Sequence, residues 1–504
     1  MPEYLAPGVY VEEIEVGAKP IEGVSTSVAG FLGQTERGPI GPRLVTGFEQ
    51  FTRLYGGHIE ESYLAYAVDG FFRNGGQRCY IGRIVGVNPK ESSLALKSKG
   101  DGGAGEELIE VKALGPGKWG DRIAVKVGSA TLLKEGLFKL IVAYGKDAAP
   151  KLEGEKLVGA SFEEVYDNLS SDPGSSDYYV KRVNGVSNLV VLEQKSPGAP
   201  PAGNLATLSG GDAGSAVGLV DYQGASTDPD QRSGLAAFEG IDEISIVCIP
   251  DENDVPGLTA EVVDHCEKMK DRFAILQSKQ SAGDVGGIRP PNDSKYAAFY
   301  YPWIKVFDPL LNAYKLVPPG GHIAGVYARS DQERGVHKAP ANEVLRGASE
   351  LEVNLSKEDQ MTLNPRGVNC IRAFPGRGIR VWGARTTSTD PLWKYVNVRR
   401  LFLFIEESID EGTQWVVFEP NNERLWARVR QTINQFLTGV WRDGALMGNN
   451  QDEAFFVRCD RTTMTQDDID NGRLIVLIGI APVKPAEFVI FRIAQVAKGS
   501  EIAE

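Results

Sequence analysis

Histidine, cysteine and glutamate are the residues with which this chain could do acid–base, nucleophilic or metal chemistry. The histidines are far apart, and none has a second histidine at the i, i+4 spacing of a helical metal site: His58, His265, His322 and His337. His265 directly precedes Cys266, which suggests a base beside a nucleophile, but neighbours on a helix point about 100° apart. Adjacent glutamates such as Glu163 and Glu164 are typical of a solvated surface.

Two further patterns could hold a phosphate or a metal. Residues 115–120 are glycine-rich and contain Lys118, yet they lack the GxxxxGK[ST] spacing of a phosphate loop, and we expect a turn there. The cysteines are odd in number, widely spaced and without a CxxC pair: Cys79, Cys248, Cys266, Cys370 and Cys459. The sequence therefore predicts no catalytic residue, no cofactor and no metal site, and hence no enzyme.

Size and charge describe a large acidic protein. Its 504 residues suffice for two to four domains. No apolar run reaches the roughly 18 residues that span a bilayer, and the N-terminus lacks a basic and apolar leader, so we expect a soluble chain made in the cytoplasm. The net charge of −13 argues against nucleic-acid binding. Residues 364–504 are nearly neutral, with 18 basic and 17 acidic side chains. Within them, residues 364–400 hold eight basic side chains and a single acidic one, Asp390, which suits either docking on an acidic protein surface or another subunit, or a solvated loop with ion pairs within the chain.

Both ends of the chain carry a short apolar segment with no evident partner. Pro7 and Gly8 exclude a helix at the start, and the strand formers that follow them belong to no apparent hairpin. Such an arm either adds an edge strand to its own domain or adds a strand to a neighbouring copy. The candidates for strand exchange are Val9, Tyr10, Val11, Glu12, Glu13 and Ile14 at the start, and Phe488, Val489, Ile490 and Phe491 at the end.

The pattern of strand, helix and loop signals changes along the chain and predicts an α+β or α/β multidomain protein. We expect an N-terminal arm (1–19), the first part of an inner domain (20–90), an inserted β-rich outer domain (91–234), an α/β domain (235–363), a C-terminal inner domain (364–485) and a C-terminal strand arm (486–504). The inner domain is discontinuous, because residues 20–90 are grouped with 364–504. In the α/β part, strands at 244–250 and 273–276 flank a helix at 258–270, which predicts a parallel layer.

The best-defined helix runs from about Asn422 to Arg442, between Pro420 and Gly444. Its apolar residues fall within one arc of about 120°. The opposite face is cationic and polar, and includes Arg424, Arg428, Gln435 and Arg442. A solvated surface or contact with an acidic partner explains this face.

Several segments, in order along the chain, resemble one family, the sheath proteins of contractile tails found in myophages, R-type bacteriocins and extracellular contractile injection systems. The similar segments are residues 7–13, 30–33, 37–39 and 71–76, the turn at 117–121 with Asp121 where the family has Asn, and residues 364–369, 378–386, 395–401, 418–421 and 471–474. The region 91–234 carries little of the resemblance beyond Trp119. The α/β part resembles the family's subtilisin-like domain in layout, which does not imply protease activity.

The resemblance implies a structural protein that polymerises. Subunits would form six-fold rings stacked helically around an inner tube, with terminal arms adding strands to neighbouring copies. Contraction would drive the tube through a target envelope, and the arginine face of residues 422–442 becomes a candidate for contact with the tube. Expected partners are further copies, the inner tube protein, and baseplate and terminal cap proteins, with no nucleic acid and no direct membrane insertion. The particle would be assembled in the producer cytoplasm as a virion or tail-like particle.

Two alternative hypotheses assign the chain to other classes of protein. An α/β hydrolase would require an enclosed serine, histidine and acid, and would act as a monomer without its termini. Another strand-exchanging capsid or baseplate component would not require the C-terminal sequence features.

Overall fold

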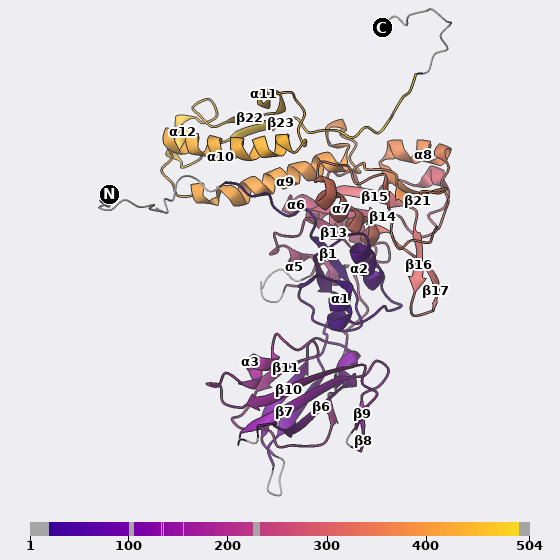
Figure 1. Ribbon diagram of the computed structural model, residues 1–504, viewed down its shortest axis with the longest axis vertical. Helices are drawn as coiled ribbons and strands as arrows, with labels where there is room; N and C mark the ends of the chain where they lie inside the picture. Colours follow the sequence, from indigo (N-terminus) through magenta and orange to yellow (C-terminus); the bar gives the residue numbers. More distant parts are fainter. Residues whose placement is uncertain are drawn as a thin grey trace, which may run out of the picture. The chain divides into compact units, whose positions relative to one another are not determined.

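The computed structural model describes residues 20–99, 105–132, 134, 136–154, 156–224 and 232–492 (Figure 1). The chain divides into two compact units. The larger unit is Ser25–Arg400, and the smaller unit combines Met1–Val24 with Leu401–Glu504. The predicted N-terminal arm, residues 1–19, lies outside the described residues.

A mostly parallel sheet forms the centre of the larger unit. Its strands, within the described residues, lie in the order β18-β21-β20-β15-β14-β13-β1-β3-β2. They are β1 (Ala29–Gly33), β2 (Arg43–Val45), β3 (Cys79–Arg83), β13 (Ile246–Cys248), β14 (Phe273–Gln277), β15 (Ala297–Tyr301), β18 (Glu343–Val344), β20 (Val368–Phe374) and β21 (Gly378–Val381). All pairings from β20 to β3 are parallel, whereas β2, β21 and β18 pair antiparallel at the two edges.

Helices cover both faces of this sheet. Every residue of β1, β14 and β15 is buried, and neighbouring residues of a strand face opposite sides, so neither face of these strands reaches solvent. Apart from α3 in the β-rich part and the start of α9, the α-helices in the described residues of the unit are α1 (Phe48–Tyr55), α2 (Leu64–Arg73), α4 (Leu219–Gln223), α5 (Gly234–Phe238), α6 (Leu258–Met269), α7 (Gly320–Arg334) and α8 (Lys357–Leu363). Helices α2 and α7 pack so closely that a Cβ at Gly321 would lie 2.3 Å from the Cα of Ala67. Glycine is required there for lack of space.

The structure groups the first part of the chain differently from the sequence prediction. Strand β1 lies between β3 and β13, with Gly30 opposite Tyr80 on one side and Val247 on the other. Residues 25–90 therefore belong to the α/β sheet and not with residues 401–504. Strands β20 and β21 join the same sheet, so the larger unit ends at Arg400 instead of near residue 364. A short apolar run in the sequence predicts a buried strand, but it does not predict which strands will be its neighbours.

Between β3 and α4 most of the regular elements are strands. Strands β10-β7-β6-β12 form one sheet and β11-β5-β4 a second, with the β8–β9 hairpin beside them. Their bounds are β4 (Ser93–Lys97), β5 (Glu107–Ala113), β6 (Ile123–Ser129), β7 (Leu137–Tyr144), β8 (Lys151–Glu153), β9 (Lys156–Val158), β10 (Phe162–Ser170), β11 (Val190–Gln194) and β12 (Ala206–Thr207), with α3 (Tyr179–Val183) between β10 and β11. An apolar core that includes Trp119, Leu140 and Tyr179 holds these elements together. The predicted turn at residues 115–120 is a tight loop that leads into a short 3-10 helix, Lys118–Arg122.

A second, smaller sheet lies in the α/β part of the larger unit. It consists of β17 (Ala313–Val317), β16 (Ile304–Asp308) and β19 (Glu350–Leu351), in that order. Strand β16 pairs antiparallel with both neighbours.

The smaller unit is built on α9 (Val396–Thr413) and α10 (Glu423–Arg442), the first of which begins in the larger unit. The predicted helix at 422–442 is confirmed: Asn422 is its N-cap and accepts hydrogen bonds from the backbone N–H groups of Arg424 and Leu425. Residues 20–24 run along α9, where the N–H of Val24 donates to the hydroxyl of Ser408. The remaining elements are α11 (Gln451–Ala454), β22 (Phe455–Arg458), α12 (Gln466–Asp470) and β23 (Leu477–Ile480).

A buried ion pair holds the two ends of the larger unit together. Arg400 donates to both carboxylate oxygens of Asp331 on α7, at 2.9 and 2.7 Å, and the two side chains are 3% and 4% exposed. The guanidinium also donates to the backbone oxygen of Thr26, whose hydroxyl donates to Asp331. The ring of Tyr327 covers it at 4.8 Å. Both connections to the smaller unit, at Ser25 and at Arg400, are thus fixed to one helix.

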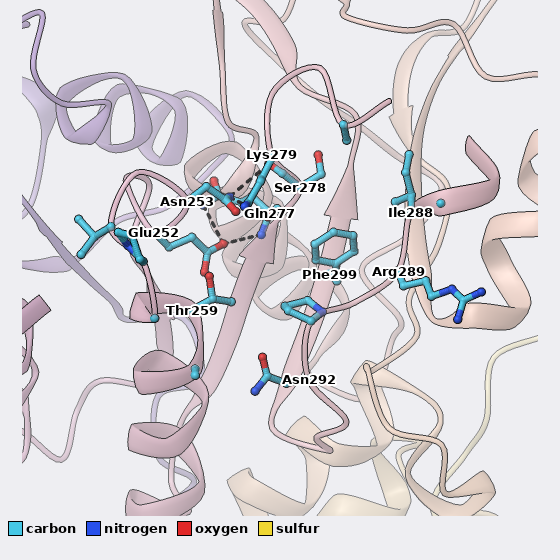
Figure 2. Close-up of a pocket in the computed structure, with 17 residues that line it drawn as sticks. Glu252, Asn253, Thr259, Gln277, Ser278, Lys279, Ile288, Arg289, Asn292 and Phe299 are labelled. Carbon is cyan, nitrogen blue, oxygen red and sulfur yellow. Dashed lines mark hydrogen bonds between the residues drawn. The ribbon is translucent and has the colours of Figure 1, made fainter. Parts of the chain in front are cut away.

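A second polar cluster lies at the carboxyl edge of the parallel sheet. Asp251 follows β13 and accepts hydrogen bonds from the hydroxyl of Ser62 and the N–H of Tyr63. Its neighbour Glu252 accepts the backbone N–H of Gln277, the last residue of β14, at 2.6 Å (Figure 2). Burial raises the pKa of Glu252 to about 8, and the hydrogen bonds from Gln277 and Thr259 oppose this only in part. The carboxyl is therefore mostly protonated at neutral pH.

We predict that Arg400→Met strongly destabilises the larger unit. The substitution leaves Asp331 buried without its cationic partner, which typically costs about 3–5 kcal/mol. Urea unfolding followed by tryptophan fluorescence measures the loss. The matched control is Arg78→Met, which breaks a half-exposed pair with Glu243 and is expected to cost less than about 1 kcal/mol. Equal losses in the two variants would contradict the prediction.

We also predict that stability falls with pH because of Glu252. The folded chain binds this proton more tightly than the unfolded chain, whose carboxyl titrates near 4.5, so stability is lost as pH rises from about 4.5 to about 8. At pH 9, Glu252→Gln should be more stable than the wild type by roughly 3–5 kcal/mol, and the difference should vanish at pH 4. The midpoints of urea unfolding, measured between pH 4 and pH 9, test this prediction, and Glu333→Gln, at an exposed residue, is the control. A constant difference between Glu252→Gln and the wild type would reject the titration of this group.

Candidate functional site

Four consecutive apolar side chains near the C-terminus are exposed to solvent. Phe488, Val489, Ile490 and Phe491 have 71%, 69%, 78% and 84% of their surface accessible. The strand predicted from Phe488 to Ala494 is absent in the described part of that segment, residues 488–492. Exposing such side chains forgoes about 25 cal/mol for each Å² of apolar surface that could be buried. A contiguous patch of this kind marks an interaction site.

A small sheet with open edges lies in the same unit. Strands β22 and β23 pair antiparallel, with Phe455 opposite Ile480 and Arg458 opposite Leu477. Among the described residues neither strand has a second neighbour in this sheet. Two-stranded sheets are marginally stable, and their unpaired N–H and C=O groups can accept further strands. Apolar side chains of both strands, Phe456 and Leu477, are about half exposed.

The candidates for strand exchange are therefore only partly visible. The C-terminal set, Phe488 to Phe491, lies in the same unit as this sheet and pairs with no strand there. The N-terminal set lies outside the described residues: Val9, Tyr10, Val11, Glu12, Glu13 and Ile14. The chain that follows them, residues 20–24, is held along α9 in the smaller unit, where Ile21 is buried against Gly412.

The cationic face predicted for α10 is exposed. Its predicted tube-facing residues all reach solvent: Arg424, Arg428, Gln435 and Arg442. The guanidinium of Arg428 lies 4.6 Å from the ring centroid of Trp415, which holds this cation at the helix surface. The opposite face carries the buried residues Leu425, Trp426, Val429, Thr432, Ile433, Leu437 and Val440. The predicted apolar arc is confirmed, with Phe436 only half-buried.

Sequence reasoning gave no role to Phe418, in the loop that joins α9 to α10. This side chain is fully exposed, and its backbone has φ of 66°, in the left-handed region that bulky residues avoid. Its neighbour Val417 is also exposed. The signal that could have revealed it is an apolar pair directly before Glu419 and Pro420, outside any helical period. An exposed aromatic on a strained backbone suits contact with a partner.

The adjacent pair His265 and Cys266 is buried in the larger unit. The Cys266 thiol is buried, which raises its pKa to about 12, so the thiolate is scarce at neutral pH. Burial and the neighbouring Arg272 lower the pKa of His265 to about 4. Within the described residues, no three His, Cys, Asp or Glu side chains are grouped as metal ligands. Among the described residues, no helix is both long enough and apolar enough to cross a membrane.

Comparison with known proteins supplies the family. The model of the phage tail sheath protein central domain matches residues 224–387, and that of the phage tail sheath C-terminal domain matches residues 388–495. The tail sheath protein of Burkholderia phage BcepMu is 23% identical over 467 residues, covering 88% of this chain and 87% of that protein. The tail sheath protein of Vibrio phage KVP40 is 26% identical over 202 residues, and the match covers 39% of this chain and 29% of that longer protein.

Solved structures agree with these matches. A chain of the anti-feeding prophage (AFP) baseplate, described as 6-fold symmetrised, has a TM-score of 0.59 at 26% identity and covers 98% of this chain and 99% of its own length. A chain of the AFP helical sheath in the contracted state has a TM-score of 0.59 at 26% identity, covering 97% of this chain and 99% of that one. The two sheath models together match more than half of the residues, without a gap from 224 to 495. This chain therefore belongs to the phage tail sheath family, the contractile sheath proteins of phage tails and contractile injection systems.

Proposed function

We propose that this sheath protein polymerises by exchanging strands between its own copies, in six-fold rings stacked helically around an inner tube. The observation that carries the proposal is the exposed apolar run at 488–491 in the same unit as the open β22–β23 sheet. A segment with unpaired backbone groups and a sheet with unpaired edges complement each other. Each added ladder hydrogen bond contributes about 1 kcal/mol net, and burial of the apolar side chains adds to it.

The linker that follows β23 favours pairing with another copy over pairing within the chain. A segment that folds back on β23 needs a tight turn between residues 481 and 487. Pro482 and Pro485 lie in this stretch, fix their own φ angles and keep the chain extended. An extended linker carries Phe488 to Phe491 away from their own strand, where a second copy can accept them.

The N-terminal arm supplies a second exchanged strand in this proposal. Its sequence, Val9 to Ile14, has the strand propensity that the role needs. Residues 20–24 anchor the arm in the unit that holds the β22–β23 sheet. A sheet with two own strands and two open edges can accept one arm at each edge. The copies then form a mesh whose links are backbone hydrogen bonds.

Contraction is proposed to be the release of a metastable extended lattice into a wider and shorter one. Strand-exchange links can persist while the compact units rearrange, because the links are extended segments outside the cores. No nucleotide is consumed in the sheath. The movement drives the tube through a target envelope. Baseplate and terminal cap proteins close the two ends of a virion or tail-like particle assembled in the producer cytoplasm.

In the extended state, the cationic face of α10 is proposed to hold an acidic surface of the tube. Arg424 and Arg428 lie one turn apart on this exposed face, and neither has an ion pair with a described residue. Phe418 lies in the loop just before the helix and adds an apolar contact. Charge complementarity of this kind sets alignment and can be broken when the lattice expands.

We predict that Phe488→Asp/Ile490→Asp yields a folded protein that does not polymerise. Both side chains are exposed in the single chain, so folding should be unchanged, while the charges prevent burial in a neighbouring sheet. Negative-stain electron microscopy and thermal unfolding measure the two properties. The control, Leu132→Asp/Val186→Asp, changes two other exposed apolar residues, in the β-rich part. Deletion of residues 1–14 should give the same result, and sheaths of normal length from either arm variant would defeat the strand-exchange proposal.

We predict that Arg424→Glu/Arg428→Glu reduces tube-filled extended particles by roughly tenfold or more, because like charges then face each other across the contact. Empty sheaths should still form, since the strand-exchange segments are intact. Coexpression with the tube protein and counting of filled particles test this. The control, Arg461→Glu/Arg473→Glu, reverses two other exposed arginines of the smaller unit. Unchanged filling in the α10 variant would remove the tube-contact proposal.

A further inference from the structure

A cluster of arginines on the β20–β21 hairpin has no role in strand exchange or in the proposed contact with the tube. Arg372 on β20 lies directly opposite Arg380 on β21 in the antiparallel ladder, and Arg377 lies in the turn between the strands. Residues that are opposite each other point to the same face of a sheet, and like charges in such a pair are destabilising. The arrangement therefore calls for a counter-charge.

Neutral oxygen atoms hold two of these guanidiniums in place. Arg380 donates to the backbone oxygen of Asn342 at 2.7 Å and to that of Arg377 at 3.1 Å. The side chains of Arg377 and Arg380 both donate to Oδ1 of Asn342, each at 3.3 Å. Two cations are thus gathered around one neutral oxygen, which positions them without neutralising them. Arg377 is exposed and Arg380 is half-buried, so a partner can reach both.

Arg372 is held in a similar way by neutral groups at α8. It donates to the backbone oxygen of Leu355 at 3.2 Å and to Oε1 of Gln360 at 2.9 Å. Hydrogen bonds from Ser356, and to a smaller extent the charge of Arg372, lower the pKa of Asp359 on this helix. The carboxylate of Asp359 caps α8 through Ser356 and forms no ion pair with Arg372. Within the described residues, the hydrogen bonds of all three guanidiniums end on uncharged oxygens.

Two aromatic rings lie among the arginines. Phe374 and Trp382 are half-buried, and their ring centroids are 4.5 Å apart. The guanidinium of Arg372 lies 5.2 Å from the centroid of Phe374, and that of Arg377 lies 5.7 Å from Phe374 and 6.0 Å from Trp382. A guanidinium against a ring is restricted in orientation, while N–H groups at its edge can still bind a carboxylate. Arginine beside aromatic rings is typical of the centre of a protein interface.

We propose that this arginine hairpin, defined as Arg372, Arg377 and Arg380 with Phe374 and Trp382, binds exposed carboxylates of a second copy of this chain. The inference rests on the proposed polymerisation and adds to strand exchange a salt-sensitive contact made by the larger unit. Carboxylates match the forked N–H donors of arginine, and docking would cover the half-exposed rings. Because the guanidiniums are already positioned, little side-chain entropy is lost on binding.

Charge complementarity identifies a second copy as the occupant. Residues 364–400 carry eight basic side chains and one acidic, whereas the rest of the chain carries 46 basic and 66 acidic. Glu60 and Glu61, in the loop before α2, are adjacent and exposed, and neither has an ion pair with a described residue. Contact between two different faces of identical subunits continues from copy to copy, as rings and helical arrays require. A free polyanion such as nucleic acid is disfavoured by the net charge of −13.

Zero-length cross-linking of the full chain carrying Arg377→Lys tests the contact. A carbodiimide joins a lysine amine to a carboxylate in direct contact with it, and the substitution keeps the positive charge. Chains labelled with light and with heavy nitrogen are mixed before assembly, so links between copies appear as peptide pairs of mixed mass. We expect such links from position 377 to a carboxylate of another copy, in sheaths and in concentrated chain at about 20 mM salt. The control is Arg53→Lys, at an exposed arginine on α1, and should give about one-tenth of the yield or less.

Charge reversal supplies a second measurement. Arg377→Glu breaks one hydrogen bond of 3.3 Å, so folding, checked by thermal unfolding, should be unchanged. It should reduce the yield of sheaths by about tenfold or more at about 150 mM salt, whereas Arg53→Glu should assemble as the wild type does. Both terminal arms are intact in this variant, which separates the contact from strand exchange.

Three results would overturn the inference: links from position 377 only within one chain, an equal yield from Arg53→Lys, or normal sheaths from Arg377→Glu. Retention on heparin that Arg377→Glu abolishes, without links between copies, would instead assign the arginine hairpin to a polyanion. A wild-type chain that forms no sheath would refute the proposed function, and the cross-links in concentrated solution would still decide this contact.

Discussion

Open strand edges and an exposed apolar run in the smaller unit are the features on which the proposed assembly depends. Within the described chain, β22 and β23 pair only with each other, and the apolar run at 488–491 lies in no strand. Water can satisfy these exposed peptide groups in the single chain, but burying the apolar side chains beside them requires a strand partner that the described chain does not supply. In the proposed assembly, strands of neighbouring copies supply these partners. Membership of the contractile sheath family agrees with this physical condition.

The larger unit has a well-packed core of its own. Its central strands are buried on both faces, and close helix packing through Gly321 leaves no space to adjust. The Arg400–Asp331 pair fixes the entering and leaving segments to α7, inside that packing. The chain thus combines a well-packed α/β core with a smaller unit whose sheet edges and terminal segment are unpaired in the described residues.

The same α/β core contains features that sheath assembly does not explain. Its carboxyl edge gathers Asp251, Glu252 and Ser278, and burial raises the pKa of the first to about 6 and of the second to about 8. Buried carboxyl groups of this kind destabilise a fold at neutral pH and above, because the folded state resists their ionisation. A fold does not dictate its function, and sites are added to folds residue by residue.

The sequence by itself determined the local elements and the family. Helical periodicity predicted α10 and its buried arc, short apolar runs predicted β13 and β14, and ordered motifs at both ends predicted a contractile sheath. Tertiary structure alone decided the partners: that β1 lies between β3 and β13, that Glu252 meets Gln277, and that Arg377 meets Asn342. Periodicity reports which face of an element is buried, but parallel neighbours come from distant parts of the chain and leave no local signal. The exposed Phe418 escaped prediction for the same reason, since exposure depends on what the rest of the fold leaves uncovered.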